Sequence, residues 1–202
     1  MNDELQRIIS GESEVRYGAN IFAAVSYLRT SAKSGTLGKT DKHFKRKETE
    51  ILKQYIDSQG IWLKDVNLNN YVSEGAEQKV YLKDSKSVIK LNDAIYFVSW
   101  EDYFVNLLLH NYFFPDTAYN LLGFFENENI VYAVVEQQFI TANQKTDLIF
   151  VEQFMNSNGF QKIRNNDYSN SELGIIIEDL HDENVLTNNG VLYFIDTVFY
   201  EK

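Results

Sequence analysis

The spacing of apolar residues changes near residue 70, and this change constrains the fold more than any other feature of the chain. Before it, residues recur at the helical interval, as in Ile21, Ala24, Val25 and Leu28. A turn at 34–38 separates this stretch from a second stripe, formed by Phe44, Ile51, Leu52, Tyr55 and Ile56. We expect Thr40 or Asp41 to cap that second helix and Gly60 to end it. The sequence therefore predicts a helical N-terminal segment over 1–66.

After residue 70, short apolar runs alternate with turn residues, which is typical of β-strands. Residues 79–82 and 87–91 predict one hairpin, and 119–125 with 129–140 predict another. Between them, Ser99 and Asp102 have capping-box spacing, which predicts a helix from about 99 to 112. A helix over 146–158 and short strands at 174–177, 184–186 and 191–196 follow. We therefore expect an α+β fold, with a sheet lobe over 67–140 and a minimal second lobe over 141–202.

Composition limits the chemistry before any motif is considered. The chain has no cysteine and only 3 histidines, which lie far apart, so a zinc site is not expected. A metal here should be a hard cation on oxygen ligands, Mg²⁺ first. No window is apolar enough to span a membrane, and the N-terminus lacks the pattern of a signal peptide. These features predict a cytoplasmic protein without a membrane partner.

The charge of the chain is acidic overall but uneven. A formal net charge of −10 argues against a protein built mainly to coat nucleic acid. Six basic residues nevertheless lie close together: Lys33, Lys39, Lys42, Lys45, Arg46 and Lys47. The favoured interpretation of the stretch 39–47 is a solvated helix face, and the alternative is a contact site for nucleic acid or an acidic partner.

The segment from Ile175 to Asp196 contains the residues best suited to catalysis. An apolar strand ends in an acidic loop at Asp179, and Asn184 follows five residues later. A short hairpin then delivers Asp196 from the end of another strand. Phosphoryl transfer uses such a set, because one carboxylate orients the attacking hydroxyl while an amide oxygen and a second carboxylate hold Mg²⁺. A solvated acidic loop is the alternative, but it does not account for Asn184 and Asp196.

These residues resemble the catalytic centre of kinases. Asp179, Leu180 and Asn184 match the pattern D-L-x-x-x-N, and Asp196 stands where the metal-binding Asp would fall. The version DLHDENVL is closer to aminoglycoside and choline kinases than to protein kinases because of His181. The resemblance implies that Asp179 is the catalytic base and that Asn184 and Asp196 bind Mg²⁺ beside ATP. It implies a supporting role in the loop for His181.

The order of the remaining elements agrees with this resemblance. VIK at 88–90 resembles the strand whose Lys contacts the ATP phosphates, which implies that role for Lys90. Glu101 is the candidate partner of Lys90, although an acid in the first turn of a helix is also favoured by the helix dipole. Adenine would meet the backbone near Glu136 to Gln138, and Gly75 is the glycine left in the phosphate loop.

Three stretches point to one subfamily: EGAEQKVYL (74–82), DLHDENVL (179–186) and FIDTVF (194–199). They are similar to the small kinase-like domain of bacterial polyvalent proteins of conjugative elements and phages, over residues 71–202. The resemblance implies a truncated protein-kinase-like fold and a phosphotransferase that uses Mg-ATP. Its acceptor is undefined and is either a small molecule or a protein.

Departures from the kinase pattern leave other functions open. The phosphate loop keeps one glycine, Ile177 replaces the usual His, and Thr197-Val198 follow Asp196. The chain also ends six residues after Asp196. The alternative is therefore a pseudokinase that acts as a non-catalytic interaction module, with a metal-dependent nuclease as a third hypothesis. We further expect the N-terminal helices to pack where the C-terminal helices of a kinase would lie.

Overall fold

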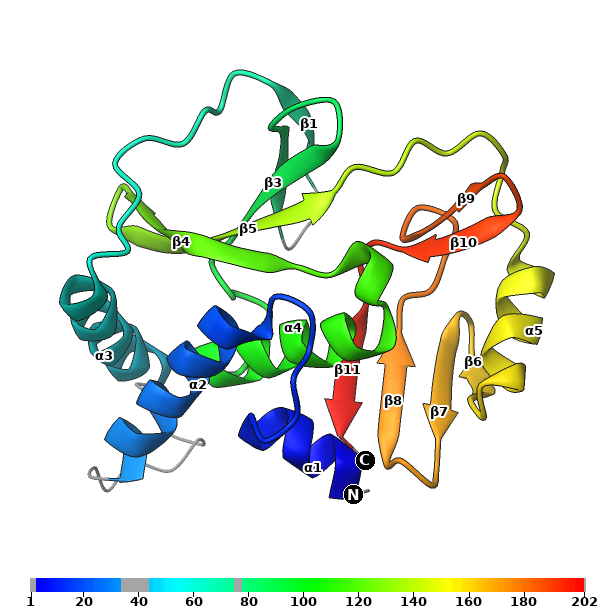
Figure 1. Ribbon diagram of the computed structural model, residues 1–202, viewed down its shortest axis with the longest axis horizontal. Helices are drawn as coiled ribbons and strands as arrows, with labels where there is room; N and C mark the ends of the chain where they lie inside the picture. Colours follow the sequence, from blue (N-terminus) through cyan, green and yellow to red (C-terminus); the bar gives the residue numbers. More distant parts are fainter. Residues whose placement is uncertain (1–2, 34–43, 75–77, 202) are drawn as a thin grey trace.

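The computed structural model describes residues 3–33, 44–74 and 78–201 and has a mixed architecture, which confirms the α+β class (Figure 1). The N-terminal part forms α1 (Asp3–Ser10), α2 (Gly18–Lys33) and α3 (Phe44–Gln59). Helix α3 ends as predicted, because Gly60 follows it at φ 63°. The proposed caps Thr40 and Asp41 lie outside the described residues. No helix of the described chain is both long and apolar enough to cross a bilayer.

The larger sheet has five antiparallel strands in the order β1-β2-β3-β5-β4. Its strands are β1 (Tyr71–Glu74), β2 (Lys79–Leu82), β3 (Ser87–Asn92), β4 (Asn120–Asn127) and β5 (Ile130–Gln138). Both predicted hairpins are confirmed, as is the helix between them, α4 (Trp100–Phe113). The Ser99 hydroxyl caps α4 by accepting from the Asp102 amide at 2.9 Å. A short 3-10 turn, η1 (Pro115–Thr117), leads from α4 into β4.

The chain between α3 and β1 is not helical, which corrects the expected helical span of 1–66. It runs beside β4: the Leu63 amide donates to the Phe124 carbonyl at 2.7 Å, and the Phe124 amide donates to the Ile61 carbonyl at 3.0 Å. Gly123 makes this approach possible. It has φ 152°, and a Cβ built on it would lie 2.5 Å from the Ile61 carbonyl oxygen.

We expect Gly123→Ala to lower the free energy of unfolding by about 2 kcal/mol, because the new methyl group strains the backbone and displaces the 61–63 segment. Gly190→Ala is the matched control, since Gly190 also has a positive φ but a Cβ there would meet no atom within 4 Å. Urea unfolding measures both variants. Equal losses in the two would show that φ alone, and not the contact with Ile61, requires glycine at position 123.

The C-terminal part contains α5 (Leu148–Ser157), a four-stranded sheet and a two-stranded hairpin. The sheet has the order β11-β8-β7-β6, formed by β6 (Gln161–Arg164), β7 (Asp167–Asn170), β8 (Ile175–Glu178) and β11 (Val198–Glu201). The hairpin joins β9 (Val185–Asn188) to β10 (Val191–Phe194). Strands β6, β7 and β11 were not predicted, and every residue of β6 is exposed, so that strand carries no apolar alternation.

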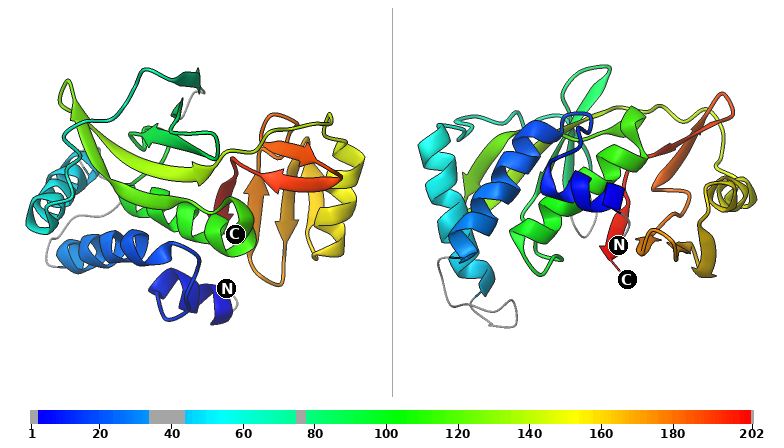
Figure 2. Two further views of the ribbon diagram at one scale, coloured as in Figure 1. Left: turned by 45° about the horizontal axis from the view of Figure 1, so that its top comes forward. Right: turned by 60° about the horizontal axis from the view of Figure 1, so that its bottom comes forward.

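The N-terminal helices share a core with the sheet and α4. Side chains from α2 (Ile21, Val25), α3 (Leu52, Ile56), α4 (Trp100, Phe104) and β4 (Phe124) are buried together. Helices α2 and α3 lie at the opposite end of the molecule from α5 (Figures 1 and 2). These two helices pack on the apolar face of α4. The expectation that they replace the C-terminal helices of a kinase is therefore wrong for α2 and α3. The boundary placed at residues 66–67 stays a prediction.

Helix α1 joins a different core. Leu5, Ile8 and Ile9 pack with Leu109 of α4, and Leu180 of the acidic loop belongs to the same buried cluster. That cluster also takes in strand residues on both sides of the loop: Ile175, Ile177, Val185, Phe194 and Phe199. The acidic loop therefore rests on a packed base that spans both halves of the chain.

Candidate functional site

Asp179 stands in a strained backbone position directly after β8. Its φ is 71°, which is uncommon for a residue other than glycine and is typical of functional loops. Two contacts hold it there: its amide donates to Asp167 Oδ1 at 3.2 Å, and its neighbour Leu180 is fully buried. The Asp179 side chain itself is 57% exposed. The loop thus presents a carboxylate to solvent from a rigid base.

Asn184 faces Asp179 across the loop. Its Nδ2 lies 3.0 Å from Asp179 Oδ2 and 3.0 Å from the Asp179 carbonyl oxygen. Both partners are acceptors, so the nitrogen of the amide must point towards Asp179. The Asn184 Oδ1 oxygen is consequently the atom that the side chain can offer to a cation.

His181 supports the Asp179 carboxylate. Its Nδ1 accepts from the Glu183 amide at 3.2 Å, so the ring proton must be on Nε2. Nε2 lies 3.3 Å from Asp179 Oδ1, where it can donate to that oxygen. The geometry agrees with the supporting role that the sequence implied for His181.

Asp196 follows β10 and lies next to the acidic loop. The Ile195 amide donates to the Asn184 carbonyl at 2.9 Å, which places the two predicted metal ligands on adjacent strands of backbone. Gln78, at the start of β2, reaches across to this carboxylate and donates from Nε2 to Asp196 Oδ2 at 2.5 Å. Sequence reasoning missed Gln78, since nothing local distinguishes it from a surface glutamine.

Lys90 brings a cation from β3 to the same place. Its side chain is buried, at 4% exposure, and Nζ donates to the Ile195 carbonyl at 2.8 Å. The Tyr119 ring centroid lies 5.1 Å from Nζ, and the Tyr119 hydroxyl also donates to the Ile195 carbonyl, at 2.8 Å. Burial lowers the pKa of Lys90, and the charge of Asp196 opposes that shift.

Lys90, Asn184 and Asp196 line one cavity of about 510 Å³. Its apolar walls come from both halves of the chain and are formed by Val72, Val80, Val88, Ile140 and Leu186. Gln138 at the end of β5 also lines it, together with Phe139 and Gln78. The cavity therefore combines an apolar slot with a cation, a carboxylate and an amide at one end. Asp179 lies beside it and is linked to it through Asn184.

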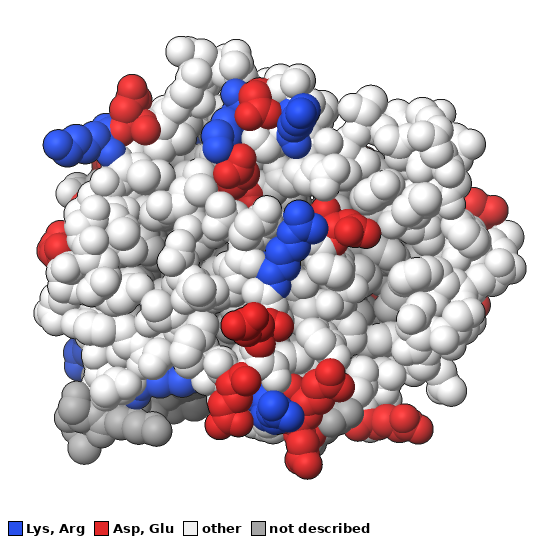
Figure 3. All heavy atoms as spheres, in the orientation of Figure 1, with Lys and Arg blue, Asp and Glu red and all other residues white. Residues whose placement is uncertain are grey.

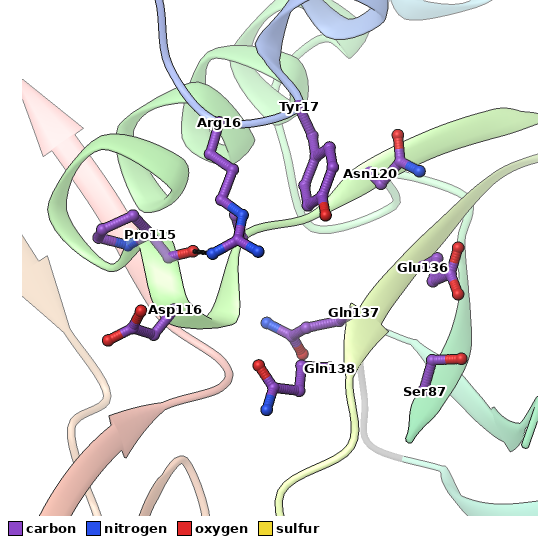
Figure 4. Close-up of a pocket in the computed structure, with 10 residues that line it drawn as sticks. Arg16, Tyr17, Ser87, Pro115, Asp116, Asn120, Glu136, Gln137 and Gln138 are labelled. Atoms are coloured by element: carbon purple, nitrogen blue, oxygen red, sulfur yellow. Dashed lines mark hydrogen bonds between the residues drawn. The ribbon is translucent and has the colours of Figure 1, made fainter. Parts of the chain in front are cut away.

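A smaller hollow of about 210 Å³ lies near the end of β5, and Glu136 belongs to it instead of the larger cavity. Figure 4 shows Gln137 and Gln138 projecting from β5 towards Arg16 and Asp116. Gln137 is held by a bond from its Nε2 to the Thr117 carbonyl at 2.6 Å. The Glu136 carboxylate pairs with Lys83 at 2.8 Å. Of residues 136–138, where the adenine contact was expected, Gln137 and Gln138 line the larger cavity and Glu136 does not.

Glu101 does not pair with Lys90, which corrects that expectation. The Glu101 carboxylate accepts from Arg29 Nε of α2 at 3.0 Å, and it lines a different cavity. Glu101 pairs with Arg29 because it lies in the first turn of α4. The charge of Lys90 acts instead on the pKa of His110, in the last turn of the same helix. Gly75, the predicted phosphate-loop glycine, lies outside the described residues.

The basic stretch 39–47 is described only from Phe44 onwards. The Lys45 ammonium donates to the carbonyl oxygens of Ala94 and Phe97, so this residue has a structural role. Arg46 pairs with Glu50 at 3.8 Å on the exposed face of α3. On the face shown in Figure 3, basic side chains are interleaved with acidic ones and form no continuous stripe. The described residues therefore do not form the basic surface that nucleic acid requires on this face.

Oxygen ligands for a cation are few at this site. Within the described ranges, no group of three or more His, Asp or Glu side chains is placed to hold a metal ion. A cation between Asp196 and Asn184 would have to complete its shell with phosphate oxygens and water. Mg²⁺ commonly binds in this way, with one or two protein ligands beside a nucleotide.

One comparison with known proteins identifies the family. A sequence model described as "Serine/Threonine/Tyrosine Kinase found in polyvalent proteins" matches residues 45–202. The match begins earlier than the resemblance seen at 71–202 and includes α3. Neither a curated protein nor a solved structure matches the chain. The match covers more than half of the sequence, and on this ground the chain belongs to the kinase family found in polyvalent proteins.

Proposed function

We propose that this protein binds Mg-ATP in the 510 Å³ cavity and transfers the γ-phosphoryl group to a hydroxyl group of a small molecule or protein. One observation carries the proposal: Lys90 of β3 lines the same cavity as Asn184 and Asp196, which flank the β9–β10 hairpin far along the chain. The volume lies within the range of small-molecule sites. The family match supports a kinase-like function. We place this activity in the cytoplasm of a bacterium that carries a mobile element.

The residues at the cavity fit the charge of a metal–nucleotide complex. Lys90 is a buried cation whose hydrogen bonds go to the neutral oxygens of Tyr119 and Ile195, so an anionic phosphate would offset its burial. Asp196 and Asn184 offer a carboxylate and an amide oxygen, which are hard ligands suited to Mg²⁺. The apolar walls formed by Val80, Val88 and Leu186 suit the faces of a nucleobase.

Each residue then has a distinct role in transfer. Mg-ATP would supply the phosphoryl group and neutralise its charge. Lys90 binds phosphate oxygens, and Asp196 with Asn184 binds the cation. Asp179 would orient the acceptor hydroxyl and take its proton as the new O–P bond forms and the bond from the γ-phosphorus to the ADP oxygen breaks, so that ADP leaves. His181 holds the Asp179 carboxylate in place. The exposure of Asp179 leaves room for an acceptor of either class.

Thermal melting with and without millimolar Mg-ATP tests the proposal. Ligand at about 100 times its dissociation constant adds about 2.7 kcal/mol, which should raise the melting midpoint of a chain this size by roughly 5–10 °C. We expect the rise in the wild type to require Mg²⁺ and to vanish in Asp196→Ala. Asp182→Ala is the matched control, because Asp182 is an acid of the same loop outside the cavity lining.

The control separates a specific site from a generally acidic loop. A rise that survives in Asp196→Ala, or that is lost equally in Asp182→Ala, would contradict the assigned metal ligand. A folded wild type whose midpoint does not move with Mg-ATP would reject nucleotide binding altogether.

The second function is a pseudokinase that serves as a non-catalytic interaction module. It is favoured by the connection between β3 and α4, where Ile95, Tyr96 and Val98 are each more than 60% exposed. Clustered apolar side chains of this kind commonly mark protein contacts. Under this hypothesis Mg-ATP leaves the melting midpoint unchanged, and polar substitution of Tyr96 and Val98 abolishes binding of a protein partner.

A further inference from the structure

We propose that His110 of α4 is a positioning residue that holds Asp196 opposite Lys90 by binding Thr197. It occupies the place at which an acidic partner of Lys90 was expected. The inference rests on the proposed nucleotide site, since it explains how Asp196 is kept in register for a cation.

The imidazole of His110 is fully buried and uses both nitrogens. Nε2 lies 3.1 Å from the Thr117 carbonyl oxygen, which can only accept, so Nε2 carries the proton. Nδ1 is then the acceptor, and the Thr197 hydroxyl donates to it at 2.7 Å. A neutral ring in this tautomer therefore ties α4 to the residue that directly follows Asp196.

The backbone on both sides of Asp196 is held by the same region. Before it, the Ile195 carbonyl accepts from Lys90 and Tyr119. After it, Asn106 of α4 accepts from the Phe199 amide at 2.8 Å and donates to the Thr197 carbonyl at 3.4 Å. Asp196 thus lies in a short segment whose backbone is hydrogen-bonded on both sides. His110 holds the side chain of Thr197, the residue directly after Asp196.

A neutral partner suits the charge of the site. Burial, and next the charge of Lys90, lower the pKa of His110 to about 3. The ring is consequently neutral and adds no positive charge beside Lys90, and Asp196 is the acidic group that acts on the pKa of Lys90. A glutamate in this position would neutralise Lys90 and weaken its attraction for phosphate.

Two substitutions separate the two nitrogens of the ring. In His110→Gln the amide replaces Nε2, so the bond to the Thr117 carbonyl can form but the acceptor for Thr197 is lost. In His110→Asn the amide oxygen replaces Nδ1 and can still accept from the Thr197 hydroxyl. The Thr117 carbonyl still accepts a hydrogen bond from Gln137 Nε2. Thr197→Val removes the same bond from the other side. Thr49→Val is its control, since the Thr49 hydroxyl also makes two partly buried hydrogen bonds, to the Lys45 carbonyl and from Trp100 Nε1.

ATP affinity measured by calorimetry with and without Mg²⁺ gives the first readout. We expect Mg²⁺ to tighten ATP binding in the wild type, His110→Asn and Thr49→Val. The gain from Mg²⁺ should fall about tenfold in His110→Gln and Thr197→Val, with Mg²⁺-free affinity unchanged. A merely structural role would lower stability without changing the gain from Mg²⁺.

Hydrogen exchange of the nucleotide-free protein gives a second readout that needs no ligand. The backbone amides of peptides covering 195–201 should exchange at least tenfold faster in His110→Gln and Thr197→Val than in His110→Asn and Thr49→Val, which keep the bond to Thr197. If both variants keep the full gain from Mg²⁺ and normal protection, the assignment of His110 is overturned. If the wild type binds no nucleotide, the proposed function fails, and the exchange rates alone decide whether His110 holds the segment.

Discussion

Lys90→Met is expected to weaken ATP binding by about 10- to 100-fold while leaving the free protein as stable as the wild type or more so. A hydrogen bond to a charged group contributes about 1.5–3 kcal/mol, which corresponds to that range of affinity. Stability should not fall, because methionine has a similar shape and removes a buried cation. The Ile195 carbonyl keeps its bond from the Tyr119 hydroxyl, so no buried acceptor is left without a partner.

Lys83→Met is the matched control for this experiment. Lys83 lies just past β2 and pairs with Glu136 on the exposed side of the sheet, outside the cavity lining. Calorimetry with Mg-ATP and melting without nucleotide measure the two effects separately. Unchanged affinity in Lys90→Met would remove Lys90 from the site, and a midpoint several degrees below the wild type would show that its charge is stabilising.

Acid is expected to destabilise the protein through His110. The pKa of its imidazole is about 3 in the folded protein against 6.5 for an ordinary histidine, so the unfolded chain binds the proton more readily. The stability associated with the neutral ring is therefore fully present above pH 6.5 and is lost progressively as the pH falls towards 3. At pH 4.5 this loss amounts to about 3 kcal/mol, from about 1.4 kcal/mol for each pH unit.

Two other ionisable groups face this ring, Lys90 from β3 and Tyr119 before β4. The measurement at pH 7 and pH 4.5 is therefore made on the wild type and on His110→Gln, which keeps both groups. Urea unfolding at the two pH values, followed by tryptophan fluorescence, measures the loss. In His110→Gln the difference between the two pH values should be about 3 kcal/mol smaller than in the wild type. Identical slopes would mean that the imidazole accepts a proton in the folded state.

The acidic loop at 179–184 could be predicted because its information is local. Asp179, His181 and Asn184 lie within six residues, and a strand followed by this loop brings their side chains together: Asn184 and His181 both contact the Asp179 carboxylate. The assignment of Asp196 depended on a hairpin, whose pairing is also short in sequence. Their roles in catalysis stay predictions.

The partners of helix α4 could not be predicted in the same way. Glu48 of α3 accepts from the amides of Trp100 and Glu101, at 2.6 and 3.1 Å, and burial raises the pKa of this carboxyl group. Nothing in the sequence around Glu48 distinguishes it from the solvated charges of the same helix. The pairing of Arg29 with Glu101 could not be predicted either, because the two residues are 72 positions apart.

The sequence by itself determined the α+β class, the two hairpins, the N-cap of α4, the end of α3 at Gly60, and the grouping of Asp179 with Asn184. Each of these depends on periodicity or turn chemistry within a few residues, which local sterics and hydrogen bonding enforce. Only the tertiary structure decided that Lys90 meets Ile195 and Tyr119, and that His110 reaches Thr197. The contact of Lys90 with Ile195 joins residues 105 positions apart, and that of His110 with Thr197 joins residues 87 positions apart. Packing of α4 between the two cores sets them.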